Sequence, residues 1–248
     1  MSSVSYPVLI LGGTSEARAL AAALHARGVA VISSLAGRVS EPRLPDGEVR
    51  VGGFGGPDGL AAWLNKHDVH AVVDATHPFA ARISASAVAA TRQAGVALLR
   101  LERSGWTQPD DADWRWVADL DEAAGLLPAL GERAFLTSGR QGLATFADLD
   151  AVWFLIRCVD RPEPPLPRRH ELLLDRGPYT VDGELELLRE HRIDVLVSKD
   201  SGGSMTAAKL HAAAQHGIPS VIVRRPPRPD APSVSKVDDA LRWALEVT

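Results

Sequence analysis

Short apolar runs alternate with longer alanine-rich segments along this chain, and most of the apolar runs end in a turn of glycines or polar residues. The first run, 7–11, is apolar throughout and leads into Gly12-Gly13, and residues 15–27 then carry apolar side chains at helical spacing. Runs of this length that are apolar on both faces are typical of buried parallel strands, which crossover helices connect. The alternation therefore predicts an α/β protein with helices on both faces of a parallel sheet.

The alternation continues to the end of the chain with one interruption at 101–113, where glycine, proline and acidic residues gather. Because 248 residues are many for one domain and ordinary for two, we place a domain boundary at this interruption. The expected fold is two Rossmann-like, doubly wound parallel-sheet domains facing a shared cleft, residues 1–102 and residues 103–248. Predicted strands are 7–11, 29–33, 48–51, 71–74, 96–99, 134–137, 151–156, 195–198 and 220–223; predicted helices are 15–27, 58–66, 79–93, 120–130, 182–191, 206–216 and 237–246.

Composition excludes several classes of protein. A hydrophobic fraction of 46% and a charged fraction of 23% are those of a folded globular chain, and a net charge of −4 disfavours a dedicated nucleic-acid binder. Cys158 is the single cysteine and no Cys/His cluster accompanies it, so we expect neither a disulfide nor a metal site. The first residues do not resemble a signal peptide and no apolar run approaches the roughly 20 residues that span a bilayer. We therefore expect a cytoplasmic protein without a membrane partner. The expected oligomeric state is a monomer.

The turn after the first predicted strand, Gly12-Gly13-Thr14-Ser15-Glu16-Ala17, resembles a dinucleotide-binding turn. Glycines at this position let a pyrophosphate approach the backbone, and the start of the following helix offers N–H groups and a partial positive charge. Gly12 and Ala17 fit the G-x-G-x-x-G/A pattern, while Thr14 replaces the middle glycine and brings a hydroxyl that can bond a phosphate oxygen. An ordinary strand–helix turn that favours glycine would look the same.

The second predicted strand ends in Ser33-Ser34, and Arg38 follows four residues later. A site that prefers NAD usually has an acidic residue here for the ribose 2′-hydroxyl. Two hydroxyls and an arginine favour a 2′-phosphate instead, because a guanidinium binds phosphate with two parallel hydrogen bonds. These residues indicate NADPH as the cofactor, unless Arg38 is simply one of the solvated arginines.

Two more turns of the first domain carry candidate ligands of the cofactor. A glycine cluster that includes Gly52 and Gly53 follows the third strand, and Asp74-Ala75-Thr76-His77-Pro78 follows the fourth. Pro78 suits the first turn of a helix, and His77 either donates to a ligand or caps the turn.

The predicted second domain repeats this arrangement of polar turns. Gly139-Arg140-Gln141 follows one strand, and Lys199-Asp200-Ser201-Gly202-Gly203 follows another. The chain has only four lysines among 27 basic residues, so a lysine beside an aspartate in a glycine-flanked turn is conspicuous. The alternative is a capped helix start with an ion-paired Lys199.

Taken together, the segments 11–18, 51–56, 74–80 and 199–203 and the Gly139-Arg140 turn resemble the precorrin-6A reductase family, and the resemblance extends from about Tyr6 to the closing helix. The resemblance implies two Rossmann-like domains with NADPH and a tetrapyrrole in the cleft between them. It also implies reduction of one double bond of the corrin precursor, precorrin-6A to precorrin-6B, in cobalamin (vitamin B12) biosynthesis, with neither metal nor flavin. A related branch takes the cobalt-containing substrate of the anaerobic route, and these motifs do not separate the two.

The expected site residues follow from the turns and the resemblance. Lys199 and Asp200 are the candidates to deliver the proton that accompanies the hydride, Asp200 either directly or by orienting a water or Lys199. Arginines such as Arg140, Arg157, Arg168 and Arg169 are expected to bind the carboxylates of the tetrapyrrole. The residues expected to bind the cofactor are Gly12, Gly13, Thr14, Ser15, Glu16, Ser33, Ser34, Arg38, Gly52, Gly53, Thr76, His77 and Pro78; those expected to bind substrate are Arg140, Gln141, Ser201 and Gly202.

Two other functions compete with this interpretation. The same scaffold suits a reductase of another unsaturated or carbonyl substrate. Glycine-rich strand–helix turns also occur in non-catalytic modules that sense nucleotides, although such a module would leave the Lys199-Asp200 turn without a role.

Overall fold

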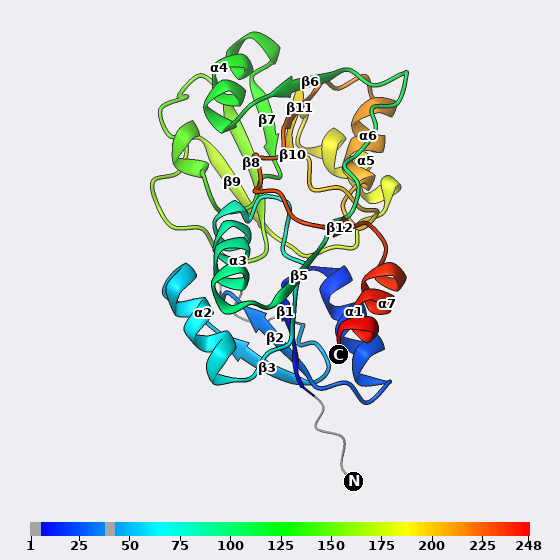
Figure 1. Ribbon diagram of the computed structural model, residues 1–248. Helices are drawn as coiled ribbons and strands as arrows, with labels where there is room; N and C mark the ends of the chain where they lie inside the picture. Colours follow the sequence, from blue (N-terminus) through cyan, green and yellow to red (C-terminus); the bar gives the residue numbers. More distant parts are fainter. Residues whose placement is uncertain (1–5, 38–42) are drawn as a thin grey trace. The chain divides into compact units, whose positions relative to one another are not determined.

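The computed structural model describes residues 6–37 and 43–248, which form two compact units. Unit 1 comprises Met1–Ser104 and Pro226–Thr248, and unit 2 comprises Gly105–Arg225. Each unit contains one six-stranded sheet, and every strand pair in both sheets is parallel (Figure 1). The expected fold of two parallel α/β domains is confirmed. Among the described residues, no helix combines the length and the apolar character needed to cross a bilayer.

Unit 1 has the strand order of a dinucleotide-binding domain. Its sheet runs β3-β2-β1-β4-β5-β12, so the chain moves outward from β1 in one direction and then from β4 in the other. The strands are β1 (Val8–Leu11), β2 (Val31–Leu35), β3 (Glu48–Val51), β4 (Ala71–Asp74), β5 (Ala97–Leu101) and β12 (Ser233–Val234), and the helices are α1 (Ser15–His25), α2 (Pro57–Lys66), α3 (Ala81–Ala94) and α7 (Val237–Val247).

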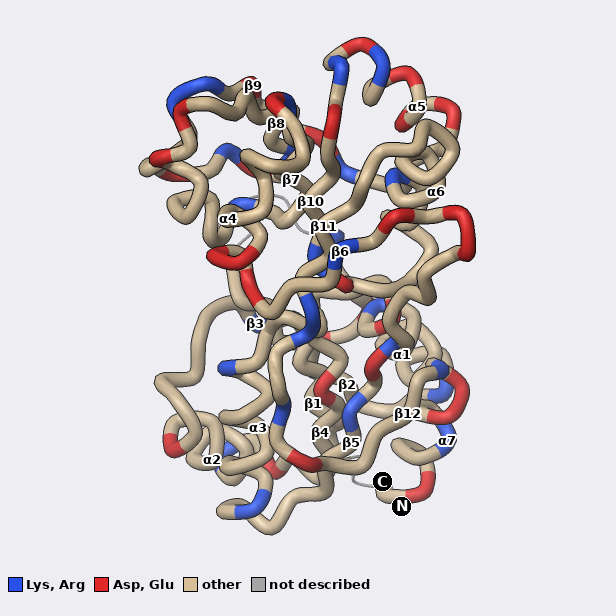
Figure 2. The backbone as a smooth tube through the Cα atoms, turned by 90° about the horizontal axis from the view of Figure 1, so that it is seen from above, with Lys and Arg blue, Asp and Glu red and all other residues tan. Residues whose placement is uncertain are grey.

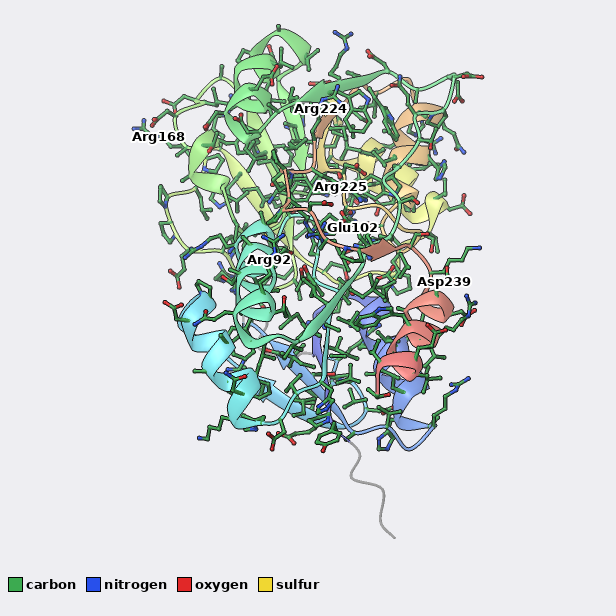
Figure 3. All side chains as sticks on the ribbon, viewed as in Figure 1. Arg92, Glu102, Arg168, Arg224, Arg225 and Asp239 are labelled. Carbon is green, nitrogen blue, oxygen red and sulfur yellow. The ribbon has the colours of Figure 1, made fainter. Side chains whose placement is uncertain are left out.

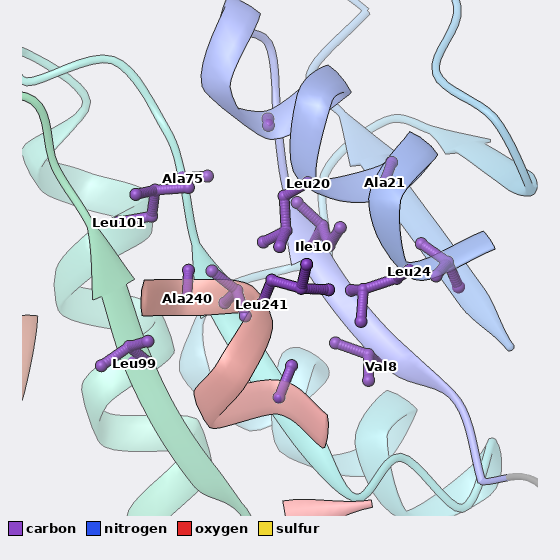
Figure 4. Packing of buried hydrophobic residues seen from close by; sticks show 14 of the residues in the cluster. Val8, Ile10, Leu20, Ala21, Leu24, Ala75, Leu99, Leu101, Ala240 and Leu241 are labelled. Carbon is purple, nitrogen blue, oxygen red and sulfur yellow. The ribbon is translucent and has the colours of Figure 1, made fainter. Parts of the chain in front are cut away.

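Helices cover both faces of this sheet because β1 is apolar on both. Val8 and Ile10 point to one face, where they pack with α1 and α7, and Leu9 and Leu11 point to the other, where they pack with α2 and α3. All four side chains are at most 1% exposed. Figure 4 shows the first of these clusters, in which Leu241 of α7 lies among the side chains of β1 and α1.

Unit 2 repeats the same strand order, as β9-β8-β7-β10-β11-β6. Helices α5 and α6 cover one face of its sheet, where Phe135, Leu155, Leu196 and Ile222 form the core, and α4 and η1 pack on the other. The strands are β6 (Trp114–Val117), β7 (Arg133–Leu136), β8 (Trp153–Cys158), β9 (His170–Leu174), β10 (Val195–Lys199) and β11 (Ser220–Val223); the helices are α4 (Leu120–Leu130), η1 (Leu143–Phe146, a 3₁₀ helix), α5 (Val181–Glu190) and α6 (Ala208–Gln215).

The sixth strand of each sheet comes from an unexpected part of the chain. In unit 1 the chain leaves after β5, and β12, which follows all of unit 2, pairs with β5 through Ser233↔Arg100 and Val234↔Leu101. In unit 2 the strand beside β11 is β6, which precedes the other five. The edge strand of unit 1 is therefore the last strand of the chain, whereas the corresponding edge strand of unit 2 is the first strand of that unit.

The return of the chain to unit 1 after unit 2 corrects the predicted domain boundary. The first crossing, at 104/105, lies close to the expected one, but the segment 226–248 belongs to unit 1 rather than to a second domain of 103–248. The physical reason is that α7 buries Ala240, Leu241 and Ala244 against the α1 face of the first sheet. No strand was predicted at the positions of β6, β9 and β12. Each is an edge strand whose side chains are not all apolar, so it lacks the pattern of a buried central strand.

We predict that closure of unit 1 by α7 makes a large contribution to its stability. Ala240→Asp places a carboxylate at a fully buried position and should lower the free energy of unfolding of unit 1 by about 3 kcal/mol or more. Leu245→Asp on the same helix is the matched control, because Leu245 is 42% exposed and its replacement should cost less than about 1 kcal/mol. Urea unfolding measures both, and equal losses would mean that α7 does not complete the core.

Candidate functional site

The carboxyl ends of β1 and β4 mark the place in unit 1 where ligands of such sheets bind, because the strand order reverses there. The turn after β1 is fixed to its neighbours by backbone hydrogen bonds, from Gly12 N to Ser34 O at 2.9 Å and from Ala75 N to Leu11 O at 3.0 Å. The structure therefore brings the turns after β1 and β4 and the carboxyl end of β2 to one edge.

Thr14 has a structural role that the sequence did not reveal. Its hydroxyl donates to the carbonyl of Ala75 at 2.8 Å and accepts from the backbone N–H of Ala17 at 3.1 Å, so it caps α1 and ties that helix to the end of β4. Because its one proton is already donated within the protein, the hydroxyl is not placed to donate to a phosphate. The backbone of the turn is what remains for a ligand.

The glycines of this edge fit a bound dinucleotide. Gly13 and Gly52 have φ of 114° and 113°, which only glycine adopts readily, and a Cβ on either residue would meet no atom within 4 Å. Gly53 has no such conformational need, and a Cβ there would also enter open space. Neither strain nor crowding within the protein explains glycine at 53, whereas the close approach of a ligand to the backbone would.

Glu16 lies in the first turn of α1 and is ion-paired with Arg103, whose Nη1 is 3.0 Å from Oε2. Burial opposes ionisation of this carboxyl, but a backbone hydrogen bond, the charge of Arg103 and the Ser15 hydroxyl outweigh burial and lower its pKa. Ser15 and Glu16 thus bond to each other at the start of the helix. Glu16 is set to position Arg103 and not to contact a phosphate directly, since the two charges would repel.

The two serines at the end of β2 differ. Ser33 is 1% exposed and lies within the strand, whereas the Ser34 hydroxyl accepts a hydrogen bond from Arg50 Nη1 at 2.8 Å. Sequence reasoning missed Arg50, although its register opposite Ser34 on the neighbouring strand would have placed the two side by side once β2 and β3 were paired. The predicted residue Arg38 lies outside the residues that the structure describes.

The turn after β4 forms a buried polar network. Asp74 Oδ1 accepts from both the backbone N–H and the hydroxyl of Thr76, at 3.2 and 2.6 Å, so this hydroxyl positions the turn. The backbone N–H of Phe79 donates to His77 Nδ1 at 3.2 Å, and Arg228 Nη2 donates to the His77 carbonyl at 2.6 Å. His77 and Pro78 therefore shape a turn before α3, which begins only at Ala81.

At the carboxyl ends of β8, β7 and β10 in unit 2, a second group of polar residues comes together. Lys199 ends β10, and burial lowers the pKa of its amine, with the nearby Cys158 opposing the shift. Burial raises the pKa of Cys158, and the charges of Arg140 and Lys199 counteract this. Arg140, Cys158 and Lys199 thus share one electrostatic environment. Basic and acidic positions are interspersed over both units (Figure 2), so the net charge of −4 does not describe this edge.

Asp200 is engaged within the protein. Its Oδ1 accepts from the backbone N–H of Trp106 at 3.0 Å, and its Oδ2 is 3.2 Å from Arg225 Nε, which also donates to the Asp200 carbonyl at 3.1 Å. Arg225 is labelled in Figure 3. Both oxygens of the carboxylate therefore hold the turn in place. This arrangement suits a positioning role for Asp200 better than proton delivery.

The predicted substrate residues divide into exposed and buried ones. Arg140 and Gln141 are exposed, Ser201 is partly exposed and Gly202 is buried. Among the other arginines expected to take carboxylates, Arg157 does not fit, because its side chain is 6% exposed and pairs with Glu184 at 2.7 Å. Arg168 lies 3.5 Å from Asp150 and remains open to solvent. Arg169 donates to the carbonyl of Ala151 at 3.2 Å.

A buried lysine was also missed. Lys209 in the first turn of α6 is 3% exposed, donates to the Thr206 carbonyl at 2.6 Å and lies 4.8 Å from the centre of the Trp106 ring. Burial, helped by the charge of Arg157 and opposed by Glu184, lowers its pKa to about 7. Helical spacing gave no signal for it, because lysine at this position resembles an ordinary solvated residue.

Comparison with known proteins identifies the family of the chain. Residues 7–245 match the family model described as Precorrin-6x reductase CbiJ/CobK. The chain belongs to the precorrin-6x reductase family. It is 55% identical over 245 residues to a protein named precorrin-6A reductase from Rhodococcus erythropolis, covering 97% of this chain and 98% of that one. A solved structure, CobK precorrin-6A reductase, has a TM-score of 0.91 and 41% identity, with 97% of this chain and 96% of that chain covered. A cobalt-precorrin-6A reductase from Salmonella typhimurium is 32% identical over 235 residues, covering 88% and 87%.

Membership of the precorrin-6x reductase family fixes the class of reaction. The protein is an oxidoreductase of cobalamin biosynthesis that acts on a CH–CH group, and a reductase of this kind takes its hydride from a nicotinamide cofactor. The open glycine backbone of unit 1 leaves room for such a cofactor to approach.

We predict that Lys209 makes stability depend on pH. A lysine in the unfolded chain titrates near 10.4, whereas Lys209 in the folded protein titrates near 7. Between these values the unfolded chain binds a proton that the folded protein does not, so stability should rise with pH by up to about 1.4 kcal/mol per pH unit.

Urea unfolding of the wild type and of Lys209→Met at pH 7, 8 and 9 tests this prediction. The wild type should gain stability relative to Lys209→Met as pH rises, and the exposed control Lys66→Met should follow the wild type. Parallel curves for wild type and Lys209→Met would show that Lys209 titrates like a solvated lysine.

Proposed function

We propose that this protein catalyses the NADPH-dependent reduction of precorrin-6A to precorrin-6B. The observation that carries the proposal is the 55% identity, over nearly the whole of both chains, to a protein named precorrin-6A reductase. The glycine-lined edge of unit 1 supports it, because this is the place where a Rossmann-like unit offers its backbone to a dinucleotide.

The substrate is the metal-free macrocycle. The chain shares 55% of its residues with the precorrin-6A reductase and 32% with the cobalt-precorrin-6A reductase. This gap favours the metal-free compound over the cobalt-containing one. A nucleotide-sensing module has no support from these relatives, which carry the names of reductases.

The reaction adds a hydride and a proton across one double bond of the macrocycle, and the cofactor, when bound, supplies the hydride and leaves as NADP⁺. The chain must therefore supply a proton to the electron-rich atom that hydride addition creates. Lys199 suits this task because it lies at the carboxyl edge of the unit 2 sheet and burial lowers the pKa of its amine. An ammonium with a lowered pKa releases its proton more readily.

Asp200 and Arg225 hold the Lys199 turn. The carboxylate receives the Trp106 N–H and the Arg225 guanidinium, and the Arg225 side chain also binds the Asp200 carbonyl. Three contacts on one residue fix the backbone directly after Lys199. Arg140 and Gln141, which are exposed beyond β7, bind acetate and propionate carboxylates of the substrate.

Supplying precorrin-6A and NADPH tests the proposed function directly. Nicotinamide absorbance should fall as the macrocycle is reduced, and mass spectrometry should show a product two hydrogens heavier. NADH in place of NADPH should give a much lower kcat/KM, and the cobalt-containing macrocycle is the competing substrate. If NADPH were oxidised in the presence of the cobalt-containing compound but not in the presence of precorrin-6A, the choice of substrate would be overturned.

We predict that Lys199→Met lowers kcat by about 10²- to 10⁴-fold, the usual contribution of a positioned proton donor. The Kd for NADPH should not change, and wild-type kcat should fall as pH rises through the pKa of Lys199, because the donor must be protonated. Lys66→Met, at an exposed lysine of unit 1, is the control and should keep full activity. Undiminished kcat in Lys199→Met would remove Lys199 from proton delivery.

A further inference from the structure

Arg50 on β3 is held over the glycine turn that follows its own strand. Its Nη1 donates to Ser34 Oγ at 2.8 Å and to the Gly52 carbonyl at 3.0 Å, and its Nη2 donates to the Gly53 carbonyl at 3.0 Å. One guanidinium therefore connects the end of β2 with the open turn after β3.

Aromatic packing fixes the plane of this guanidinium. Its central carbon lies 3.7 Å from the centre of the Phe54 ring and 5.6 Å from that of Trp63, and the two rings meet edge to face at 5.4 Å. A cation held against aromatic rings loses little further conformational freedom when it binds a ligand. Burial lowers the pKa of Arg50 from its ordinary value, and a guanidinium still remains charged at neutral pH.

The three hydrogen bonds leave a defined edge of the side chain available. A guanidinium has five N–H donors; both on Nη1 and one on Nη2 are used, which leaves one on Nη2 and the one on Nε. These two N–H groups have no further hydrogen-bond partner among the residues that the structure describes. They lie along one edge of the guanidinium, and such an edge matches two oxygens of a phosphate.

The place of Arg50 in the strand order identifies which phosphate it would meet. The end of β2 is where sheets of this order recognise the adenosine ribose, through an acidic residue for a 2′-hydroxyl or an arginine for a 2′-phosphate. The chain from Ser33 to Arg38 contains no acidic residue. Ser34, at the end of β2, instead accepts a hydrogen bond from Arg50.

We propose that Arg50 is the residue that selects a 2′-phosphorylated cofactor, binding the 2′-phosphate through its Nε and Nη2 edge. This inference rests on the proposed use of NADPH and adds to it the side chain responsible. It differs from the expectation based on sequence, in which Arg38 had this role.

The experiment measures the Kd of NADPH and of NADH for the full-length wild type, Arg50→Gln and Arg50→Lys by tryptophan fluorescence. Arg50→Gln should weaken NADPH binding by about 10- to 100-fold and change NADH binding by less than about threefold. Arg50→Lys keeps the charge but cannot donate two parallel hydrogen bonds, so its Kd for NADPH should lie between those of the wild type and Arg50→Gln. Arg27→Gln is the control, since Arg27 is exposed and its side chain donates to the Ala23 carbonyl of α1.

Ser34→Asp is a second variant, which tests the same position by placing a negative charge beside Arg50. A carboxylate beside Arg50 should repel a 2′-phosphate and accept from a 2′-hydroxyl, so the preference should move toward NADH by at least tenfold. Thermal unfolding of each variant reports whether it is folded.

The outcomes separate this inference from the proposed function. A wild type that binds both nucleotides equally overturns the proposed NADPH preference and the inference with it. A wild type that prefers NADPH while Arg50→Gln and Ser34→Asp keep that preference overturns the role of Arg50 alone. Equal weakening of both nucleotides by Arg50→Gln also overturns it, because Arg50 would then only hold the turn. Loss of the preference in Arg38→Gln alone would restore the assignment to Arg38.

Discussion

The pairing of β12 with β5 is the interaction on which the architecture depends. It obliges the chain to complete β6 to β11 before the sheet of unit 1 has its sixth strand, and it brings α7 onto the α1 face. The returning segment is fixed at two further points, by Arg100 Nη2 on the Pro229 carbonyl at 2.8 Å and by Arg228 on the His77 carbonyl. The end of the chain thus closes the core of unit 1 and also shapes the turn after β4. Unit 2 is one continuous stretch of chain, whereas unit 1 combines two stretches that are separated by the whole of unit 2.

The carboxyl edge of unit 1 offers backbone where the sequence suggested side chains. Thr14 is committed to Ala75 and Ala17, the Thr76 hydroxyl to Asp74, and Glu16 to Arg103. Hydrogen bonds within the edge keep these groups in place, so these groups set the shape and rigidity of the turns. At Gly13, Gly52 and Gly53 no side chain separates the backbone from open space, although the Gly52 N–H itself is donated to the Leu35 carbonyl at 2.9 Å. A preformed edge of this kind lowers the entropy that binding must overcome.

The fold was largely predictable from the sequence, and the site only in part. Strands such as β1 and β4 are apolar on both faces and cannot be mistaken for surface segments, so the parallel sheets and their polar turns followed from pattern alone. β12 has two residues, too few for any periodicity, and its pairing depends on a partner more than 130 positions away. Arg50 was missed for the same reason, because its role comes from the pairing of β2 with β3 and not from a motif. Arg157 was misjudged because the sequence does not show that Glu184 faces it inside the core.

The distribution of lysine and arginine follows the chemistry that each can perform. Of 27 basic residues, only four are lysines, and Lys66 and Lys236 are exposed. The other two, Lys199 and Lys209, lie in unit 2 with pKa values lowered by burial. A guanidinium does not lose its proton under any ordinary condition, whereas an amine in a poorly solvated position does. Arginine therefore serves where a fixed charge holds a turn, as Arg225 does at Asp200 and Arg50 does at Gly52 and Gly53. The buried amines of Lys199 and Lys209 therefore lose a proton more readily than a solvated lysine does.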